Sequence, residues 1–289
     1  MTVSIMITTK NRAADLRRTL QILHELDPEP VEILITADGC TDNTVEMLKA
    51  ETLKGEIKNL KVIVNEAGMG SVASRDRMMR EVRDDLVLAL DDDSYPEQPD
   101  CLARIAALFE QNPRLAIAHF PQRTDEYPET LTQEDFGPAR LTNSFANSGA
   151  MLRRSVYLQL PGFETQFFHM YEEPDYALQC VAAGHDVLFT PIVIIRHHYS
   201  GAARSELHNH QRHSRNECWS TVMRCPLPQM PFVVIYRVFS QFQYACKRGW
   251  GWVIREPVWW AQALRGIPNC LRRRQPVAWV RYRAWLQMK

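Results

Sequence analysis

Three consecutive aspartates, Asp91, Asp92 and Asp93, come directly after the hydrophobic run 86–90. Carboxylates this close repel one another, and a bound divalent cation offsets the repulsion. Hard cations such as Mg²⁺ and Mn²⁺ take carboxylate oxygens and share their remaining positions with phosphate. If the extended geometry of the run persists, Asp91 and Asp93 point to one side and Asp92 points away. The pattern favours a metal site at Asp91 and Asp93 over a solvated acidic turn ahead of Pro99.

A second acidic group, formed by Glu172, Glu173 and Asp175, lies in the segment YEEPDYALQ. Because proline is common in the first turn of a helix, we expect a helix to begin near Pro174. Glu173 would then lie close to the N-terminal cap, where its charge suits the helix dipole. The segment is therefore either simple acidic capping or the source of a catalytic carboxylate.

Short β-branched runs alternate with amphipathic, charged segments through the first hundred residues. This pattern predicts strands at 3–8, 31–36, 60–65 and 86–90. It predicts helices that begin near Asn11, Thr41, Ser71 and Pro99. Strands that are buried on both faces and separated by helices indicate an α/β fold with a mostly parallel central sheet.

Polar residues follow each predicted strand. In a parallel α/β sheet, ligands bind beyond the carboxyl ends of the strands, so these side chains should converge on one crevice. All of them are suited to binding a nucleotide. They are Thr8, Thr9, Lys10, Asn11 and Arg12 after the first strand, Asp38 after the second, Asn65 and Glu66 after the third, and Asp91 to Asp93 after the fourth.

Composition limits the class of protein. The 289 residues carry no net charge and are 45% apolar, which suits a folded chain with a large core. The length favours one large domain with a C-terminal extension, or two domains. Seven scattered cysteines without a CxxC pair favour a reducing, cytoplasmic compartment. The apolar runs are too short or too interrupted by Pro and Arg for a signal peptide or a spanning helix, and we expect neither.

Several ordered motifs in residues 2–200 resemble the family 2 glycosyltransferases, which have the GT-A fold. ITTKNR is similar to the family's opening nucleotide-binding strand and turn, ADGCTDNT to its DDGSTDGT segment, and NEAGMGSVASRDRMM to its N-x-G-x-x-x-A-R-N segment. LALDDDSYP resembles its Asp-x-Asp motif, NSGAMLRRSVYLQLPGFE its acceptor-side segment, and YEEPDYALQCVAAGHDVLFTP its acidic helix. Each motif is weak alone, whereas their order and spacing together are specific.

The resemblance implies a catalytic GT-A domain over residues 1–203, with a Rossmann-like, mostly parallel sheet flanked by helices, and a C-terminal helical extension over 204–289. It implies an inverting enzyme of polysaccharide biosynthesis that moves a sugar from a nucleotide-diphosphate sugar to a hydroxyl of a glycan or lipid-linked acceptor. Mg²⁺ or Mn²⁺ would neutralise the diphosphate leaving group. One base on the face opposite the leaving group implies a single displacement, and inversion follows.

The resemblance also implies roles for individual residues. Glu173 matches the catalytic carboxylate and would act as general base, with Asp175 binding or orienting the acceptor. A histidine in VIIRHHYSG would complete the metal shell of Asp91 and Asp93 or close over the diphosphate, and His197 is the closer match. The residues expected to hold the donor are Thr8, Thr9, Asn11, Arg12, Asp38, Asn65, Arg75 and Asp92.

Some positions depart from the family pattern or allow two interpretations. Ala37 replaces the first aspartate of the base-binding pair and Cys40 replaces a serine, so UDP, GDP and dTDP sugars all stay open. Arg75 is either a phosphate contact or an exposed helix arginine. The pair Arg215 and Asn216 is either helix surface or a phosphate contact.

The composition changes after about residue 203. Six of the seven tryptophans lie in 250–285, and seven Arg or Lys but no acidic residue follow Glu256. Aromatic and basic residues alternate in REPVWWAQALRGI and QPVAWVRYRAWLQMK, with Pro257 and Pro276 at the expected helix starts. Such helices favour peripheral attachment to an anionic membrane surface at the inner face of the cell membrane. The alternative is a cap whose tryptophans pack on the catalytic domain. Nucleic acid is not expected as a partner, because the rest of the chain is not basic.

Two functions from other classes compete with the transferase. A sugar-nucleotide pyrophosphorylase would need a Gly-rich, basic loop after the first strand, and TTKNR has no glycine. A non-catalytic nucleotide- or membrane-binding protein would need no base, so its function would survive the loss of Glu173.

Overall fold

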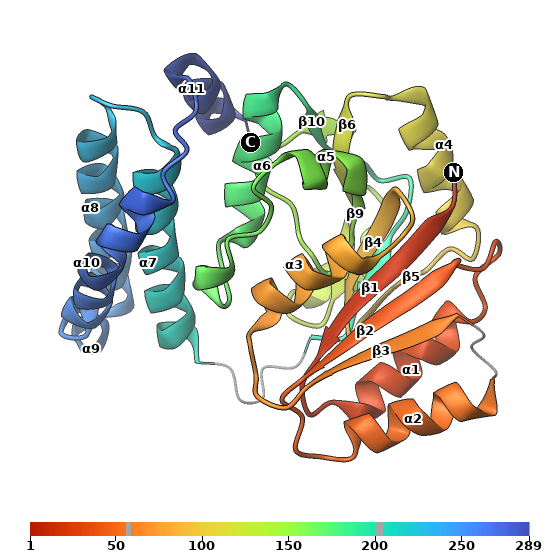
Figure 1. Cartoon of the computed structure of the whole chain (residues 1–289). Helices are drawn as coiled ribbons and strands as arrows, with labels where there is room; N and C mark the ends of the chain where they lie inside the picture. The colour runs from red at the N-terminus through yellow and green to blue at the C-terminus, as the bar shows by residue number, and fades with distance from the viewer. Residues whose placement is uncertain (56–58, 200–204, 289) are drawn as a thin grey trace.

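The computed structural model describes residues 1–55, 59–199 and 205–288. Two sheets form the first two thirds of the chain, and helices cover both faces of the larger sheet (Figure 1). The strands are β1 (Val3–Thr9), β2 (Glu32–Asp38), β3 (Leu60–Asn65), β4 (Leu86–Asp91), β5 (Ser94–Pro96), β6 (Leu115–His119), β7 (Gln122–Thr124), β8 (Arg140–Leu141), β9 (Ala150–Arg153), β10 (Asp186–Phe189) and β11 (Ile195–His197). The helices are α1 (Ala13–Leu23), α2 (Thr44–Lys54), α3 (Ser71–Glu81), α4 (Cys101–Gln111), α5 (Arg154–Gln159), α6 (Glu172–Ala183), α7 (Glu206–Arg224), α8 (Met230–Arg248), α9 (Trp250–Val253), α10 (Glu256–Arg272) and α11 (Trp279–Gln287), with 3₁₀ turns at Pro128–Thr132 and Thr165–Phe167.

The larger sheet has eight strands in the order β3-β2-β1-β4-β9-β6-β10-β8. Strands β1 to β4 are mutually parallel, and β9 runs antiparallel to both of its neighbours. Thr8 of β1 pairs with Thr36 of β2 and with Asp91 of β4. The polar ends of these three strands therefore meet at one edge of the sheet, as the sequence predicted.

Alternating side chains of β1 enter two different cores. Ile5 and Ile7 pack with α1, α2 and α4 on one face of the sheet. Met6 packs with α3 and α6 on the other face. This period of two leaves β1 buried on both sides, which the continuous apolar run VSIMIT predicted.

The strand predicted at 60–65 is present, but the expectation that it is buried on both faces is wrong. Strand β3 is the outermost strand, and Lys61 and Val64 are exposed. It has a sheet neighbour on one side only, because the order ends there, and flanking helices cover it less than β1.

The second sheet joins distant parts of the chain in the order β5-β11-β7. Strand β5 starts immediately after the three aspartates, and His197 of β11 pairs with Ser94 of β5. This antiparallel pairing brings a residue that lies about a hundred positions later in the chain beside the end of β4.

The C-terminal helices stack against the α/β region that contains the two sheets. Figure 1 shows α7 beside α6, with α8 and α10 farther out, and α11 returning to the top of α6. Trp219 of α7 and Trp285 of α11 belong to the same buried core as α6. The predicted boundary between 203 and 204 lies outside the described residues.

The predicted start of the last helix at Pro276 is wrong, since α11 begins at Trp279. The N–H groups of Gln275 and Val277 donate instead to the carbonyls of Met223 and Arg224 at the end of α7. Pro257 does lie in the first turn of α10, as expected. Among the described residues, no helix combines the length and apolar character needed to cross a bilayer.

Candidate active site at the carboxyl ends of the strands

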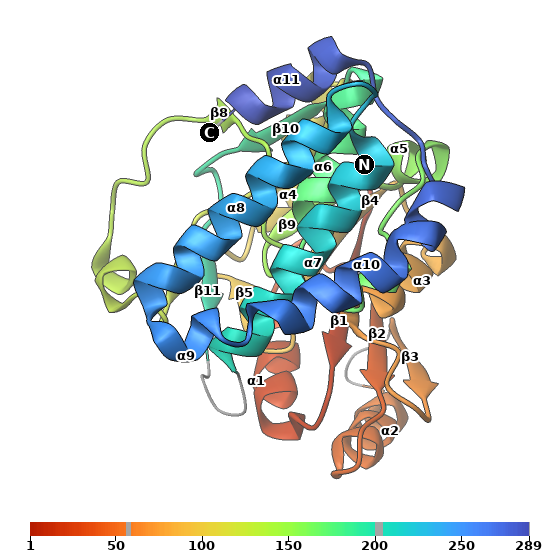
Figure 2. The same cartoon turned by 90° about the vertical axis from the view of Figure 1, so that its left-hand side faces the viewer.

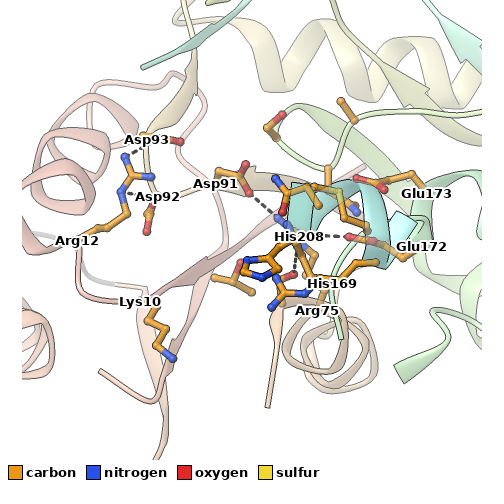
Figure 3. A pocket seen from close by; sticks show the side chains of 18 of the residues that line it. Lys10, Arg12, Arg75, Asp91, Asp92, Asp93, His169, Glu172, Glu173 and His208 are labelled. Atoms are coloured by element: carbon orange, nitrogen blue, oxygen red, sulfur yellow. Dashed lines mark hydrogen bonds and ion pairs between the residues drawn. The ribbon is translucent and has the colours of Figure 1, made fainter. Parts of the chain in front are cut away.

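A cavity of about 460 Å³ lies at the carboxyl ends of β1 and β4. Figure 3 shows its side chains, with Asp91 between the Arg12, Asp92 and Asp93 group and the Glu172 and Glu173 pair. The predicted site residues that line it are Thr8, Arg12, Arg75, Asp91, Asp92, Asp93 and Glu173. The remaining predicted residues are not among its lining residues and are described below.

Asp91, Asp93 and His197 form a cluster that could hold a metal ion. One ligand atom from each lies within 4.8 Å of the others. His197 Nε2 is 3.2 Å from Asp93 Oδ1, and its Nδ1 lies 3.1 Å from Gln122 Oε1. Because an amide oxygen only accepts, Nδ1 donates the proton there and Nε2 faces the carboxylates. Either a proton or a metal ion can bridge Nε2 and Asp93, and this donor set suits Mn²⁺ or Mg²⁺.

Arg12 and burial set the charge state of the aspartates beside the cluster. Burial raises the pKa of Asp93, but His197 and Arg12 outweigh burial and lower it overall. The Arg12 guanidinium forms an ion pair with Asp93 at 2.7 Å. Asp92 turns away from the cluster, as predicted, and accepts a hydrogen bond from Thr9 Oγ1 at 2.8 Å. Burial raises the pKa of Asp92 to about 7.

Arg75 links the metal-ligand cluster to the acidic start of α6. Its guanidinium donates to Asp91 and also lies 3.5 Å from Glu172. Arg75 is buried, so the interpretation as an exposed helix arginine is wrong. The two carboxylates on either side of the guanidinium hold it against the cavity wall.

Glu173 lies in the first turn of α6 and lines the cavity. The helix begins at Glu172, two residues before the expected start at Pro174, because Tyr171 turns the chain with φ of 73°. Burial and the adjacent Glu172 carboxylate raise the pKa of Glu173 to about 8. A carboxylate with such a pKa can accept a proton near neutral pH.

The structure does not bring Asp175 into the cavity. Its side chain is buried between α6 and α7, where it pairs with Arg224 at 3.1 Å. Ser220 Oγ and Gln179 Nε2 also donate to its carboxylate, at 2.6 and 2.8 Å. An acceptor contact would require this network to break, so the geometry assigns Asp175 a structural position that joins the catalytic region to the C-terminal helices.

We expect Arg224→Ala to lower the free energy of unfolding by about 3–5 kcal/mol, because it leaves the buried Asp175 carboxylate without its counterion. Urea denaturation followed by circular dichroism measures this loss. Arg77→Ala is the matched control: its partner Glu81 is half-exposed, so the loss should stay below about 1 kcal/mol. Equal losses for the two variants would contradict a structural role for the Asp175 pair.

Three other predicted donor residues shape the loops behind the cavity. Asp38 accepts hydrogen bonds from the N–H groups of Met69 and Gly70 and from Asn65 Nδ2. Burial raises the pKa of Asp38, but these donors outweigh burial and lower it overall. Asn11 Oδ1 accepts from the N–H of Thr41 at 2.7 Å. These contacts hold together the turns that follow the first three strands.

Sequence reasoning missed the part of the cavity formed by α7 and the loops before β9 and α6. The segments 146–148 and 169–170 line it together with Glu172, and α7 contributes His208, Asn209 and Arg212. His208, Asn209 and Arg212 lie outside the motifs quoted above, whereas Asn147 and Ser148 begin the segment similar to the family's acceptor-side motif. Sequence reasoning considered only Arg215 and Asn216 within α7, and the polar composition of HNHQRHSRN could have drawn attention to the turns before them.

Asn216 is neither helix surface nor a phosphate contact, so both predicted alternatives are wrong for it. It is fully buried and donates to the carbonyls of His169 and Met170 at 2.9 and 2.7 Å. Its neighbour Arg215 donates to the carbonyl of Phe167 and lies over the Trp219 ring. Helix α7 thereby fixes the loop that carries two cavity residues.

The comparisons with known proteins agree with this geometry. Residues 4–182, well over half of the chain, match the Glycosyl transferase family 2. An uncharacterized glycosyltransferase of Haemophilus influenzae is 24% identical over 202 residues, which are 66% of this chain and 65% of that relative. The match therefore spans just under two thirds of the relative's length.

Solved structures share the fold at low sequence identity. Mannosyltransferase PcManGT of Pyrobaculum calidifontis, in complex with GDP-Man and Mn²⁺, has a TM-score of 0.61 at 16% identity. The match covers 94% of this chain and 83% of the PcManGT chain. TarS 1–349 of S. aureus with UDP-GlcNAc has a TM-score of 0.63 at 15% identity, over 94% and 82%. GalNAc-T7 with UDP, GalNAc and Mn²⁺ has a TM-score of 0.64 at 14% identity, over 78% of this chain and 48% of that one.

The mostly parallel sheet, its flanking helices and these structures define a GT-A fold with a helical C-terminal region, as the sequence predicted. The chain belongs to glycosyl transferase family 2. Membership of this family favours a transferase over the pyrophosphorylase and the non-catalytic alternatives.

Proposed function

We propose that the protein is an inverting glycosyltransferase that moves a sugar from a nucleotide-diphosphate sugar to a hydroxyl of a glycan or lipid-linked acceptor. One observation carries the proposal: Asp91 and Asp93 of the metal-ligand cluster line the same cavity as Glu173. A transferase needs a cation for the leaving group and a base for the incoming hydroxyl within reach of one sugar ring.

The donor end of the cavity carries both anionic and cationic side chains. Asp91, Asp93 and His197 would hold Mg²⁺ or Mn²⁺, which neutralises the diphosphate as it leaves. Lys10 and Arg12 line the same end and supply positive charge for phosphate oxygens. The turns held by Asn11, Asp38 and Asn65 lie behind them and are proposed to support the nucleotide, as the family resemblance implies.

Glu173 is proposed as the general base at the acceptor end. It lies in a cavity wall rather than on a flexible loop, since α6 and the Asp175 network fix its backbone. In its deprotonated form it would remove the proton from the acceptor hydroxyl as oxygen attacks the sugar carbon. No second carboxylate is needed as a nucleophile in this scheme, and a single displacement inverts the configuration.

A second cavity, of about 630 Å³, adjoins the first and is proposed to hold the acceptor. The two cavities share Met170 and Asn209 as lining residues. Tyr127 and Tyr244 line the second cavity and are exposed. Amphipathic aromatic rings of this kind offer an apolar face and a hydroxyl to a sugar. Tyr127 comes from the loop 122–141 of the catalytic region.

The proposed setting is polysaccharide biosynthesis in the cytoplasm, with peripheral attachment at the inner face of the cell membrane. Reduced cysteines and the absence of a spanning helix among the described residues are compatible with this setting. From the inner face of the membrane, the protein would reach an acceptor that is carried on a lipid.

The function is tested by incubating purified protein with a panel of UDP, GDP and dTDP sugars, Mn²⁺ or Mg²⁺, and a pool of glycan and lipid-linked acceptors. We expect metal-dependent release of one nucleoside diphosphate that rises when an acceptor is present. The product should carry the sugar with inverted anomeric configuration by nuclear magnetic resonance. Retained configuration would rule out the single displacement.

A further inference from the structure

The outer surface of the C-terminal helices is unusually apolar. More than half of the exposed large hydrophobic side chains among the described residues lie between 227 and 286. On α8, Phe232, Ile235 and Phe239 are 73%, 67% and 57% exposed. Their spacing of three and four residues places them along one side of the helix. This stripe faces away from α7, which contacts the opposite side of α8 through the Arg237 and Glu217 pair.

Helix α10 presents a matching stripe beside it. Leu264 and Leu271, seven residues apart on one side of the helix, are 72% and 50% exposed, whereas Trp259 and Cys270 on the inner side are buried. Figure 2 shows α8 and α10 on the face turned toward the viewer, where they diverge from the end at which α9 joins them. The two stripes and the groove between them form one surface, which we call the α8–α10 face.

The groove between the helices is itself almost purely apolar. It is lined by Val234, Ile235, Val238, Phe239 and Phe242 of α8 and by Trp260 of α10. Exposed apolar surface on this scale in a protein marks a contact with another phase or partner.

Charge identifies the occupant. Glu256 is the only acidic residue from 218 to 289, and it is fully buried against His210 and Trp259. Exposed cations border the stripes, with Arg265 next to Leu264 and Arg272 next to Leu271. Two copies of this chain meeting symmetrically through the face would bring cations together without acidic partners. An anionic lipid surface meets both the apolar stripes and the cations.

We propose that the α8–α10 face docks on an anionic lipid bilayer. This assignment narrows the sequence-based expectation, which relied on the six tryptophans of 250–285 and on the basic residues after Glu256. Trp259 and Trp285 are buried in the protein, so they cannot anchor it, and the anchoring side chains come mainly from α8.

Docking through this face would also place the proposed acceptor cavity close to lipid. Gln241, Tyr244 and Arg248 of α8 line that cavity, so the same helix forms one of its walls and part of the membrane contact. This consequence rests on the proposed function, whereas the docking itself does not.

The test is flotation of the full chain with vesicles of phosphatidylcholine alone or mixed in equal parts with phosphatidylglycerol. We expect binding to the anionic vesicles and at least about tenfold weaker binding to the neutral ones. The combined variant Phe232→Ser, Ile235→Ser, Phe239→Ser should lower the partition coefficient on anionic vesicles by at least about tenfold. Arg265→Glu with Arg272→Glu should weaken binding and remove most of its salt dependence.

The matched control is the variant Val31→Ser, Leu53→Ser, Leu158→Ser, which removes three exposed apolar side chains from other surfaces. It should bind like the unmodified protein. The proposal is overturned if the α8 variant still floats normally, or if the unmodified protein ignores anionic vesicles. It is also overturned if ultracentrifugation shows a dimer that the α8 variant dissolves while vesicle binding is absent.

Nucleotide release in the same preparations separates this inference from the enzymatic one. Because the α8 stripe lies outside the cavity lining, the α8 variant should release nucleoside diphosphate from soluble donor at an unchanged rate. Vesicle binding without any nucleotide release would leave the docking face standing and reject the proposed activity.

Discussion

Glu173→Gln should lower kcat by roughly two to four orders of magnitude and leave the donor KM unchanged, because the substitution removes the base but keeps the shape of the side chain. The measurement is steady-state nucleotide release at saturating donor with varied acceptor. Turnover close to that of the unmodified protein would reject Glu173 as the base. Glu172→Gln is the neighbouring control: it should keep much more activity, since Glu172 is buried beside Arg75 and does not act on the acceptor in this scheme.

The pH dependence gives the same assignment a second readout. The pKa of Glu173 lies at about 8 because of burial and the Glu172 carboxylate, so kcat/KM for the acceptor should rise with pH up to about 8. Glu173→Gln should lose this rise. Glu172→Gln should move it to lower pH, since one of the two causes of the raised pKa is gone.

As pH rises toward about 8, the stability of the folded protein should fall while its activity rises. The ordinary pKa of this carboxyl is 4.5, so between 4.5 and about 8 the folded protein holds a proton that the unfolded chain has released. The free energy of unfolding therefore falls as pH rises through that window. Glu173→Gln removes this cost, and we expect the variant to be more stable than the unmodified protein at pH 8. An inactive variant that is also less stable would point to misfolding instead.

Asp93→Ala should weaken Mn²⁺ binding by more than about a hundredfold and lower turnover by a comparable factor, because a carboxylate ligand is lost. Isothermal titration calorimetry with Mn²⁺ alone measures the affinity without any substrate. The effect should be large because Asp93 is held against His197 and Arg12 in a buried position that water does not fill easily.

Asp92→Asn is the matched control within the same three residues. Asp92 points toward Thr9, outside the metal-ligand cluster, and an amide can keep that hydrogen bond. Its Mn²⁺ affinity should stay within about threefold of the unmodified protein, far less than the loss of a direct ligand. Unchanged Mn²⁺ affinity in Asp93→Ala, or equal losses in both variants, would contradict the proposed metal site.

Local patterns predicted much of the fold. The apolar runs before Thr8, Asp38 and Asp91 identified three neighbouring strands because a strand buried on both faces needs a continuous hydrophobic sequence. The same reasoning misjudged β3, since the position of a strand within the sheet depends on partners that its own sequence does not specify. The start of α11 was misplaced for a similar reason: hydrogen bonds to the end of α7 decided it.

The candidate site was predictable where its residues follow strands. Asp91 and Asp93 follow a predicted strand, where carboxylates suit a metal ion, whereas the role expected of Glu173 came from the family resemblance. Asp175 is also acidic and lies in the same motif as Glu173, yet its carboxylate turns to Arg224 of α7, a helix that lies far along the chain. His208 and Arg212 reach the cavity from α7 only through tertiary packing.

One side of helix α7 lines the candidate active-site cavity, and another side packs against α8 and α10. The stretch that matches the family ends at residue 182, before α7 begins. A protein shortened to that stretch would lose Asn216, which donates a hydrogen bond to the carbonyl of His169. It would also leave the Asp175 carboxylate without its counterion Arg224. The part of this chain that the proposed activity needs is accordingly longer than the stretch that matches the family. Truncation to that stretch would remove α7 and with it one wall of the candidate active-site cavity.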